Sequence, residues 1–473
     1  MRILTSRQRH VAYVSALAVA LAAGACSDIN VPDYNRAGFS DLQTAPNRTL
    51  VDAAAAGMLA SARIDAGTRV RLIGIVGREA YYLDPNESRY VTELVTGAID
   101  PSSFAGNHNH LNIYGTIAQG NVLLTAIDKV PATEYTDAQK ESLRGFTKTV
   151  MASEYLVLAM MRQFAVVDVN ADPLAPPAPL KPQVEVYAKA RQLFDEGAAH
   201  LKAGGAAFTF KLPSGLTGSG LNVNNPSSTF YQFNRGLRSR LDILVRDYAS
   251  AKTSLAESFI TTNTGTRAEF NRGAYYTYSA ASGDRANLLA TGTPEMAEPT
   301  LKTDAQIKPG GGRDNRFDLK VDTAGTSVTR YNITSNLRFK LYRSTPFFGT
   351  SGTASPIPWV RNEELILNRA EARWFTNDRP GALADLNFVR TNSGGLAAIA
   401  MPANDEAFIT ALLYERRYSL LYEGGYRWLD LRRFGRLATL NDFPRSGDKS
   451  IEFFPIPFVE CLARGGAGSA PGC

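Results

Sequence analysis

The chain has 473 residues and a net charge of +6 at neutral pH, and 44% of its residues are hydrophobic. This length could hold two or three domains, but no charged or Gln/Ser-rich linker divides the evenly spread apolar residues, so we expect one large domain. The first 25 residues contain three arginines and no acids. The rest of the chain therefore has 48 of the 51 basic residues and all 45 acidic ones, a net charge of +3. So small a positive charge argues against nucleic acid as a partner.

The N-terminus has the composition of an export signal. Three arginines precede an apolar stretch over residues 11–25 that is too short to span a membrane, so we predict a signal peptide over residues 1–25. The sequence Ala23-Gly24-Ala25-Cys26 resembles a bacterial lipobox, with Ala23 at the place usually held by leucine. This resemblance predicts a lipid on Cys26 and a tether over residues 26–38. No later apolar run is long enough for a transmembrane helix.

Most of the remaining chain has helical periodicity. From Leu50 to Ala203 apolar residues recur at helical spacing, and Thr136 with Gln139 forms a capping box that predicts the start of one helix. Further helices are predicted over residues 233–245, 248–260, 363–376 and 381–389. These short antiparallel pairs resemble degenerate tetratricopeptide repeats and predict a mostly α fold.

Residues 265–358 have a different composition. The segment is rich in Gly, Thr, Tyr and Asn, and short alternating runs at 326–331 and 337–342 predict a few small strands in long loops. We expect an irregular insertion in a helical scaffold that otherwise occupies residues 39–473. Loops mounted on a rigid scaffold are where binding residues usually lie.

Neither metal ligands nor catalytic residues form a known pattern. His108 and His110 lack a third ligand at zinc spacing, so we expect them in a solvated loop. Asp168, Asn170 and Asp172 alternate like the start of a calcium loop, but the glycine at the sixth position is missing. No metalloprotease, nucleophile-elbow or P-loop motif is present. We predict no metal site, no cofactor and no catalytic residue.

The segment Tyr414–Leu437 combines helical apolar spacing with many charges. Gly424 and Gly425 predict a break between two helices. Acids alternate with arginines beside Trp428, which favours an internal lattice of ion pairs over a surface that binds nucleic acid. The charged residues are Glu415, Arg416, Arg417, Glu423, Arg427, Asp430, Arg432, Arg433 and Arg436.

The C-terminal motifs closely resemble those of the SusD/RagB family, surface lipoproteins that serve nutrient importers in the outer membrane of Bacteroidetes-like bacteria. The resemblance lies in Glu415-Arg416-Arg417, Glu423-Gly424, Arg427 to Arg433, Phe454-Pro455-Ile456-Pro457 with Glu460, Arg369-Ala370-Glu371-Ala372, Leu386-Asn387 and Val389-Arg390. Tyr114, Ile117, Gly120-Asn121 and Leu124 also look like the family's first signature helix.

The resemblance implies a SusD-like fold and a lipid-anchored protein exposed on the outer membrane. Such a protein captures oligosaccharides or peptides, without turning them over, for a SusC-like TonB-dependent transporter. Two other classes stay open from the residues alone. One is a secreted glycan hydrolase, because 45 acids can furnish a catalytic pair, and the other is a tetratricopeptide-type scaffold with no small ligand.

Under this resemblance, the ligand surface is expected where the loops before the Tyr114 helix meet the irregular half. Both segments contain aromatic residues beside Asn, Arg and Gly in predicted loops. Ring faces stack on the C–H surfaces of sugars, and planar polar groups bind their hydroxyls. The predicted binding residues are Tyr82, Arg89, Tyr90, Phe104, Asn107, His108, Tyr275, Tyr276 and Tyr278.

Cys461 and Cys473 lie among glycines and alanines near the C-terminus. In an oxidising compartment they could close a short loop, but a tail with two free thiols fits the sequence equally well. The sequence leaves both alternatives open.

Overall fold

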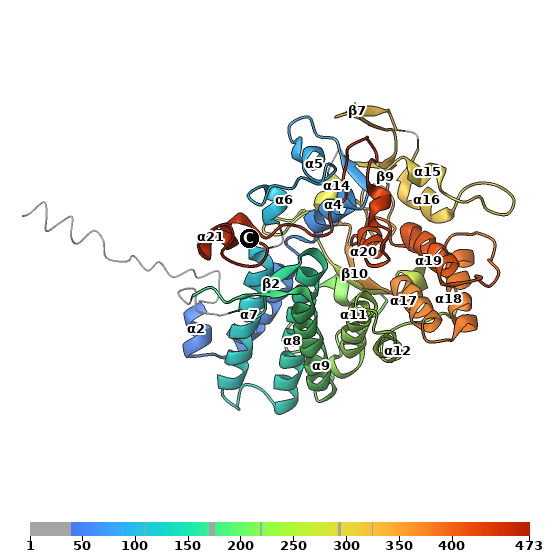
Figure 1. Cartoon of the computed structure of the whole chain (residues 1–473). Coiled ribbons are helices and arrows are strands. Elements are labelled where there is room, and N and C mark those ends of the chain that lie inside the picture. The colour runs from blue at the N-terminus through green and yellow to red at the C-terminus, as the bar shows by residue number, and fades with distance from the viewer. Residues whose placement is uncertain (1–38, 109, 170–175, 218–219, 292–294, 324) are drawn as a thin grey trace, which may run out of the picture.

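The computed structural model describes residues 39–473 except 109, 170–175, 218–219, 292–294 and 324. Cys26, Asn170 and Asp172 lie outside these residues. Helices dominate the described chain, as predicted (Figure 1). The longer helices are α3 (Arg48–Ala62), α4 (Ala66–Val76), α7 (Leu111–Lys129), α8 (Asp137–Met161), α9 (Gln183–Lys202), α11 (Tyr231–Leu244), α12 (Tyr248–Ala256), α17 (Asn362–Trp374), α18 (Arg379–Asn392), α19 (Asp405–Ser419) and α20 (Tyr426–Arg433).

Short helices connect these elements. They are α2 (Phe39–Thr44), α5 (Arg89–Thr92), α6 (Phe104–Asn107), α10 (Ser214–Thr217), α13 (Arg267–Phe270), α14 (Leu288–Thr291), α15 (Thr300–Thr303), α16 (Asn315–Lys320) and α21 (Phe458–Ala463). Among the described residues, none of the helices is both long and apolar enough to cross a membrane.

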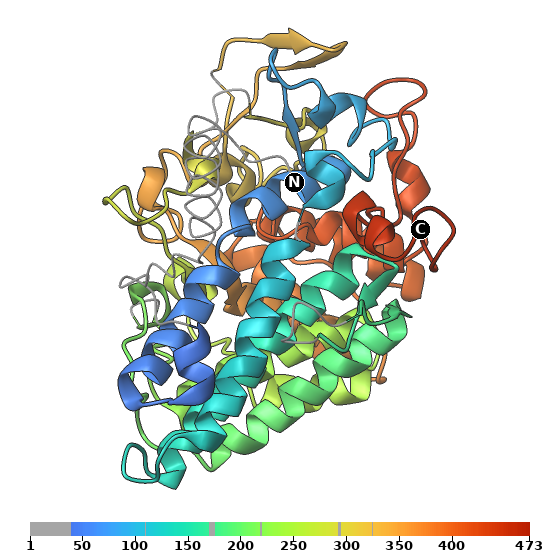
Figure 2. The ribbon, with the colours of Figure 1, turned by 90° about the vertical axis from the view of Figure 1, so that its left-hand side faces the viewer.

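Helices α3, α7, α8 and α9 form a layer in which neighbours run side by side (Figure 2). Helix α8 begins with the predicted capping box, in which Thr136 accepts from the Gln139 N–H and the Gln139 side chain accepts from the Thr136 N–H. Two orphan N–H groups are thereby satisfied, which fixes the start of this long helix. The predicted pairs α11–α12 and α17–α18 are present, although α12 ends at Ala256 rather than at Ile260.

The strands are short and join distant parts of the chain. A four-stranded sheet has the order β1-β5-β9-β6, and β1 pairs antiparallel with β5 through Ala80 and Ala297. A two-stranded sheet pairs β4 with β10, and two further hairpin-like pairs are β2–β3 and β7–β8. The strands are β1 (Ala80–Tyr82), β2 (Phe164–Val166), β3 (Leu180–Pro182), β4 (Gly273–Tyr276), β5 (Glu295–Ala297), β6 (Val321–Asp322), β7 (Val328–Arg330), β8 (Ile333–Ser335), β9 (Arg338–Phe339) and β10 (Ile357–Arg361).

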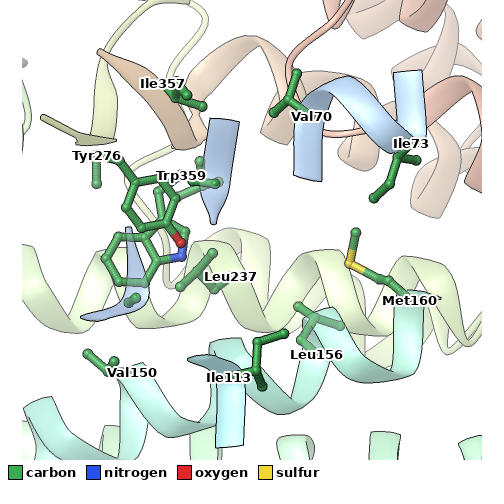
Figure 3. Packing of buried hydrophobic residues seen from close by; sticks show 14 of the residues in the cluster. Val70, Ile73, Ile113, Val150, Leu156, Met160, Leu237, Tyr276, Ile357 and Trp359 are labelled. Carbon is green, nitrogen blue, oxygen red and sulfur yellow. The ribbon is translucent and has the colours of Figure 1, made fainter. Parts of the chain in front are cut away.

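One large apolar core joins the helical layer to the small sheets. Figure 3 shows part of this core, in which Leu237 of α11 lies beside Trp359 of β10, and Leu156 of α8 lies beside Ile113 of α7. A second core lies between α17, α18 and α19, where the rings of Trp374 and Phe408 stack with their centroids 4.2 Å apart. Each fully buried side chain of this size contributes roughly 1.5–3 kcal/mol of transfer free energy.

The predicted lattice of ion pairs around α19 and α20 is confirmed. Asp430 is 4% exposed and lies 2.9 Å from Nη1 of Arg416 and 2.8 Å from Nη2 of Arg433. The two helices are separated at Gly425, whose φ of +78° favours glycine. A Cβ there would lie 2.0 Å from Cγ2 of Ile73, so the chain has no room for a side chain at this bend.

Two contacts of the C-terminal region were left open or missed by the sequence, a disulfide and an ion pair. Cys461 and Cys473 form a disulfide with a Cα separation of 5.5 Å. His110 is 5% exposed, and its Nε2 lies 2.7 Å from Oε2 of Glu460. The prediction of a solvated loop is therefore wrong for His110, because α21 packs against the start of α7. Burial opposes ionisation of Glu460, but His110 and Arg464 hold the pKa of Glu460 at about 2.

Candidate functional site

Three aromatic rings from separate elements form one cluster, which we call the aromatic shelf. Tyr82 ends β1, Tyr90 lies in α5 and Phe104 begins α6. The ring centroids of Tyr82 and Tyr90 are 4.4 Å apart, and those of Tyr90 and Phe104 are 4.9 Å apart. All three residues are partly exposed, and neither tyrosine hydroxyl bonds another described residue. The shelf therefore presents ring surfaces and two free hydroxyl groups to solvent.

Two arginines border the aromatic shelf. Cζ of Arg71 lies 4.3 Å from the centroid of Tyr82, and Nε of Arg71 donates to Glu295 at 2.8 Å. Arg71 is 7% exposed, so this ion pair fixes a cation against the ring. Arg89 is exposed, with Cζ 4.9 Å from the centroid of Phe104 and a two-pronged pair to Glu87. The buried guanidinium of Arg71 thus holds the Tyr82 ring in position, and the exposed guanidinium of Arg89 is accessible to a ligand.

The polar atoms of Asn107 and His108 mostly face the protein. The Asn107 side chain donates to the carbonyl oxygens of Ser102 and Ser103, so it stabilises its own turn. Nε2 of His108 is buried and has no partner among the described residues. Burial lowers the pKa of His108 to about 4, so the imidazole is neutral at pH 7. The structure brings Arg89 to the three rings but gives Asn107 and His108 internal contacts.

The prediction that Tyr275, Tyr276 and Tyr278 lie in an exposed loop is wrong. Tyr275 and Tyr276 belong to β4, and the three residues are 4%, 6% and 8% exposed. The ring of Tyr276 stacks on Trp359 with centroids 4.5 Å apart, as Figure 3 shows. The Tyr275 hydroxyl donates to Asn271 O, and the Tyr278 hydroxyl to Arg63 O. These side chains are buried because β4 pairs with β10, a strand about 80 residues further along the chain.

Helix α4 lies between the tyrosines of the aromatic shelf and the buried tyrosines at β4. Its Arg71 contacts Tyr82 of the aromatic shelf. Burial raises the pKa of Tyr276 and of Tyr278 above the usual value, and the charge of Arg69 opposes that rise. Residues two apart on a helix point about 200° apart, so Arg69 and Arg71 face different sides of α4. The two tyrosine groups therefore belong to different sides of this helix.

Glu154 of α8 is a buried acid on the Arg69 side. It is 2% exposed, and its Oε1 has no hydrogen-bond partner among the described residues. Burial raises the pKa of Glu154 from 4.5 to about 8, while Arg69 opposes this rise and Asp65 adds to it. Between these pH values the folded protein keeps a proton that the unfolded chain has lost. The contribution of Glu154 to stability is therefore present below about pH 4.5 and is lost as pH rises toward 8.

We expect Glu154→Gln to reduce the loss of stability between pH 5 and pH 8, because a buried neutral amide does not have to keep a proton. At pH 8 the variant should be more stable than the parent by about 1 kcal/mol or more, with little difference at pH 5. Urea unfolding across pH 5–8 measures the effect, and the exposed variant Glu185→Gln is the control. A parallel decline in the parent and in Glu154→Gln would contradict the prediction.

Among the comparisons with known proteins, the family model matches the C-terminal part of the chain. Residues 319–455 match the model of the SusD family. This segment of the chain is therefore similar to the SusD family. The matched segment contains the ion-pair lattice around α19 and α20, and the aromatic shelf lies before it. A comparison with curated protein sequences found no match.

Solved SusD-like structures share the fold over most of the chain. A SusD-like protein from Bacteroides fragilis is 14% identical, with a TM-score of 0.67 over 89% of this chain and 96% of that one. A laminarin-binding SusD-like protein is 18% identical, with a TM-score of 0.64 over 88% and 98%. A SusD-like carbohydrate-binding protein from Bacteroides vulgatus is 19% identical, with a TM-score of 0.55 over 82% and 84%. At these identities the likeness shows a SusD-like fold.

Sequence reasoning missed two residues that hold tyrosine rings of this SusD-like chain in place, Arg71 at the aromatic shelf and Trp359 at the buried Tyr276. Arg71 lies in an apolar helix, and its partner Glu295 is 224 residues away, so no local pattern links them. Trp359, the stacking partner of Tyr276, follows a segment that was expected to be irregular.

Within the described part of the chain, no three His, Cys, Asp or Glu side chains are grouped closely enough to hold a metal ion.

Proposed function

We propose that this SusD-like protein captures oligosaccharides at the aromatic shelf. The observation that carries the proposal is the cluster of Tyr82, Tyr90 and Phe104, with two free hydroxyls and the accessible guanidinium of Arg89 beside it. Partly exposed rings match the C–H faces of sugar rings, and the hydroxyl and guanidinium groups match sugar hydroxyls. Two SusD-like structures of the same fold are named for binding laminarin and carbohydrate. Binding without turnover follows the family, and peptides are the alternative ligands.

Removal of one shelf ring should weaken glycan binding without unfolding the protein. We expect Tyr82→Ala and Tyr90→Ala to lose about 1–3 kcal/mol of binding free energy, a factor of about five to a hundred or more. The test is to find a ligand on a glycan and peptide array and to titrate it calorimetrically, with melting temperatures recorded for each variant. Tyr231→Ala removes another partly exposed tyrosine and is the matched control.

The outcomes separate binding from packing. Unchanged affinity in both shelf variants, or losses that match losses in melting temperature, would place the glycan elsewhere. By contrast, Tyr276→Ala removes a buried, stacked ring and should cost about 3–5 kcal/mol of stability. If only peptides bind on the array, the ligand class is peptide.

We further propose that residues 1–25 are an export signal and that Cys26, with the tether to residue 38, carries the lipid anchor in the outer membrane. Stable membrane residence needs more than one acyl chain, and a lipobox cysteine receives them. Cys26→Ala should therefore move the protein from the membrane fraction to the soluble fraction, as checked by fractionation and by the mass of the N-terminal peptide. A variant that stays in the membrane with an unchanged N-terminal mass would disprove the anchor.

Delivery of the glycan to a SusC-like TonB-dependent transporter completes the proposal. It rests on the family, whose members serve such importers. Co-purification of the transporter with the lipid-anchored protein tests this step separately from glycan binding.

A further inference from the structure

A cavity of about 500 Å³ lies between α3, the 211–216 segment and the β4–β10 pair. One wall is a helical stripe, because Ala56, Leu59 and Ala60 of α3 and Arg63, which caps that helix, recur at the spacing of one helix face. This volume lies within the usual range for small-molecule sites. The cavity does not include the aromatic shelf, whose rings lie on the other side of α4.

The remaining walls are apolar and aromatic. Leu212 and Leu216 contribute from the 211–216 segment, and Tyr276 and Trp359 contribute the stacked ring pair seen in Figure 3. This segment lies close against β4 at Gly215, where a Cβ would come within 2.4 Å of Thr277 Cγ2. The aromatic wall and the facing segment are thus held in fixed positions.

The polar groups at this cavity are few, and one is an unpaired cation. Arg63 is already engaged, because it donates to Asp284 and to the carbonyl oxygen of Thr277. Lys211 is exposed and has no acidic partner among the described residues. An oligosaccharide would bury hydroxyl groups against walls that offer few partners, which is unfavourable. The chemistry instead suits an apolar ring with one negative charge.

We propose that this cavity binds a small aromatic carboxylate, with its ring against the Tyr276–Trp359 wall and its carboxylate at Lys211. This site goes beyond the proposed glycan capture and is independent of it. An aromatic ring gains contact with the stacked pair. An ammonium at the rim favours the carboxylate over a neutral group of the same shape.

Cinnamate and cinnamyl alcohol are the probes, because they share the ring and differ in charge. We expect saturable one-to-one binding of cinnamate in calorimetric titration and binding of the alcohol that is five- to tenfold weaker. Lys211→Gln should remove this preference. Ala60→Leu should abolish binding, because it fills the cavity from an exposed helix position that tolerates leucine. Gly57→Leu on the same helix faces open space and is the matched control.

Several results would overturn the proposal. They are equal binding of the acid and the alcohol, no binding of cinnamate, tighter binding of hexanoate than of cinnamate, or full binding by Ala60→Leu. The array glycan serves as a cross-check: Ala60→Leu should bind it normally, and cinnamate should not displace it. Displacement would show that the cavity is part of the glycan site, which also overturns the proposal. Glycan binding lost in Tyr82→Ala but kept in Ala60→Leu distinguishes the two sites.

Discussion

Glu423→Ala is expected to lower the free energy of unfolding by about 3–5 kcal/mol, because it leaves two buried cations without their main partner. Glu423 accepts from Arg361 at 2.6 Å and 3.0 Å and from Lys320 at 2.8 Å. Arg361 and Lys320 are 1% and 0% exposed. Burial opposes the charged form of Arg361, but Glu423 and Glu363 raise the pKa of Arg361 well above its usual value. Burial lowers the pKa of Lys320, and Glu423 opposes that change.

Chemical denaturation followed by circular dichroism measures this loss. Glu87→Ala is the matched control, because it removes an acid that pairs with an arginine at the surface. Exposed pairs contribute about 0–1 kcal/mol, so the control should unfold almost like the parent. A loss below about 1 kcal/mol in Glu423→Ala would show that the lattice does not hold the fold together. Double replacement of Glu423 and Lys320 by apolar residues should cost less than the sum of the single changes.

Arg78→Ala is expected to cost about 4 kcal/mol or more, a loss at the extreme of single substitutions. Arg78 is fully buried and donates to backbone carbonyls of three separate segments. Its Nε bonds Phe443 O at 2.8 Å, and Nη2 bonds Val95 O at 2.7 Å and Lys449 O at 3.2 Å. Without the guanidinium these carbonyl oxygens lose their partners in a dry environment.

If the Arg78→Ala variant fails to fold, the Arg78→Lys variant still tests the contribution of the guanidinium to stability. An ammonium lacks the planar fork that reaches several carbonyls at once, so the lysine variant should also be destabilised, by about 2 kcal/mol or more. Arg272→Ala is the control, since Arg272 also bonds backbone carbonyls, at Phe259 and Gly220, but is only partly buried. Unfolding midpoints for Arg78→Lys equal to those of the control would contradict this role.

The helical scaffold was predictable because its signals are local. The Thr136 capping box predicted the start of α8, and the two helices of the α17–α18 pair were predicted from the apolar spacing of neighbouring residues. The alternating charges beside Trp428 predicted an internal lattice, which the structure confirms. The partners across that lattice, such as Arg361 and Lys320 for Glu423, could not be read from the sequence.

The candidate site was only partly predictable. Tyr82, Arg89, Tyr90 and Phe104 were chosen from one short stretch, and the structure brings them together. The tyrosines of β4 were assigned to a loop from their composition. They are buried because β10 pairs with β4, and composition contains no information about a strand partner so far along the chain.

The sequence by itself determined the start of α8 at its capping box, the mostly α fold, the family motifs and the internal character of the C-terminal charges. Those features depend on contacts within one or two helical turns, or on motifs read in order. Only the tertiary structure decided which tyrosines are exposed, that Arg71 and Glu295 support the aromatic shelf, and that Cys461 bonds Cys473. These depend on segments that meet after folding, where burial is set by whichever distant element packs against a side chain.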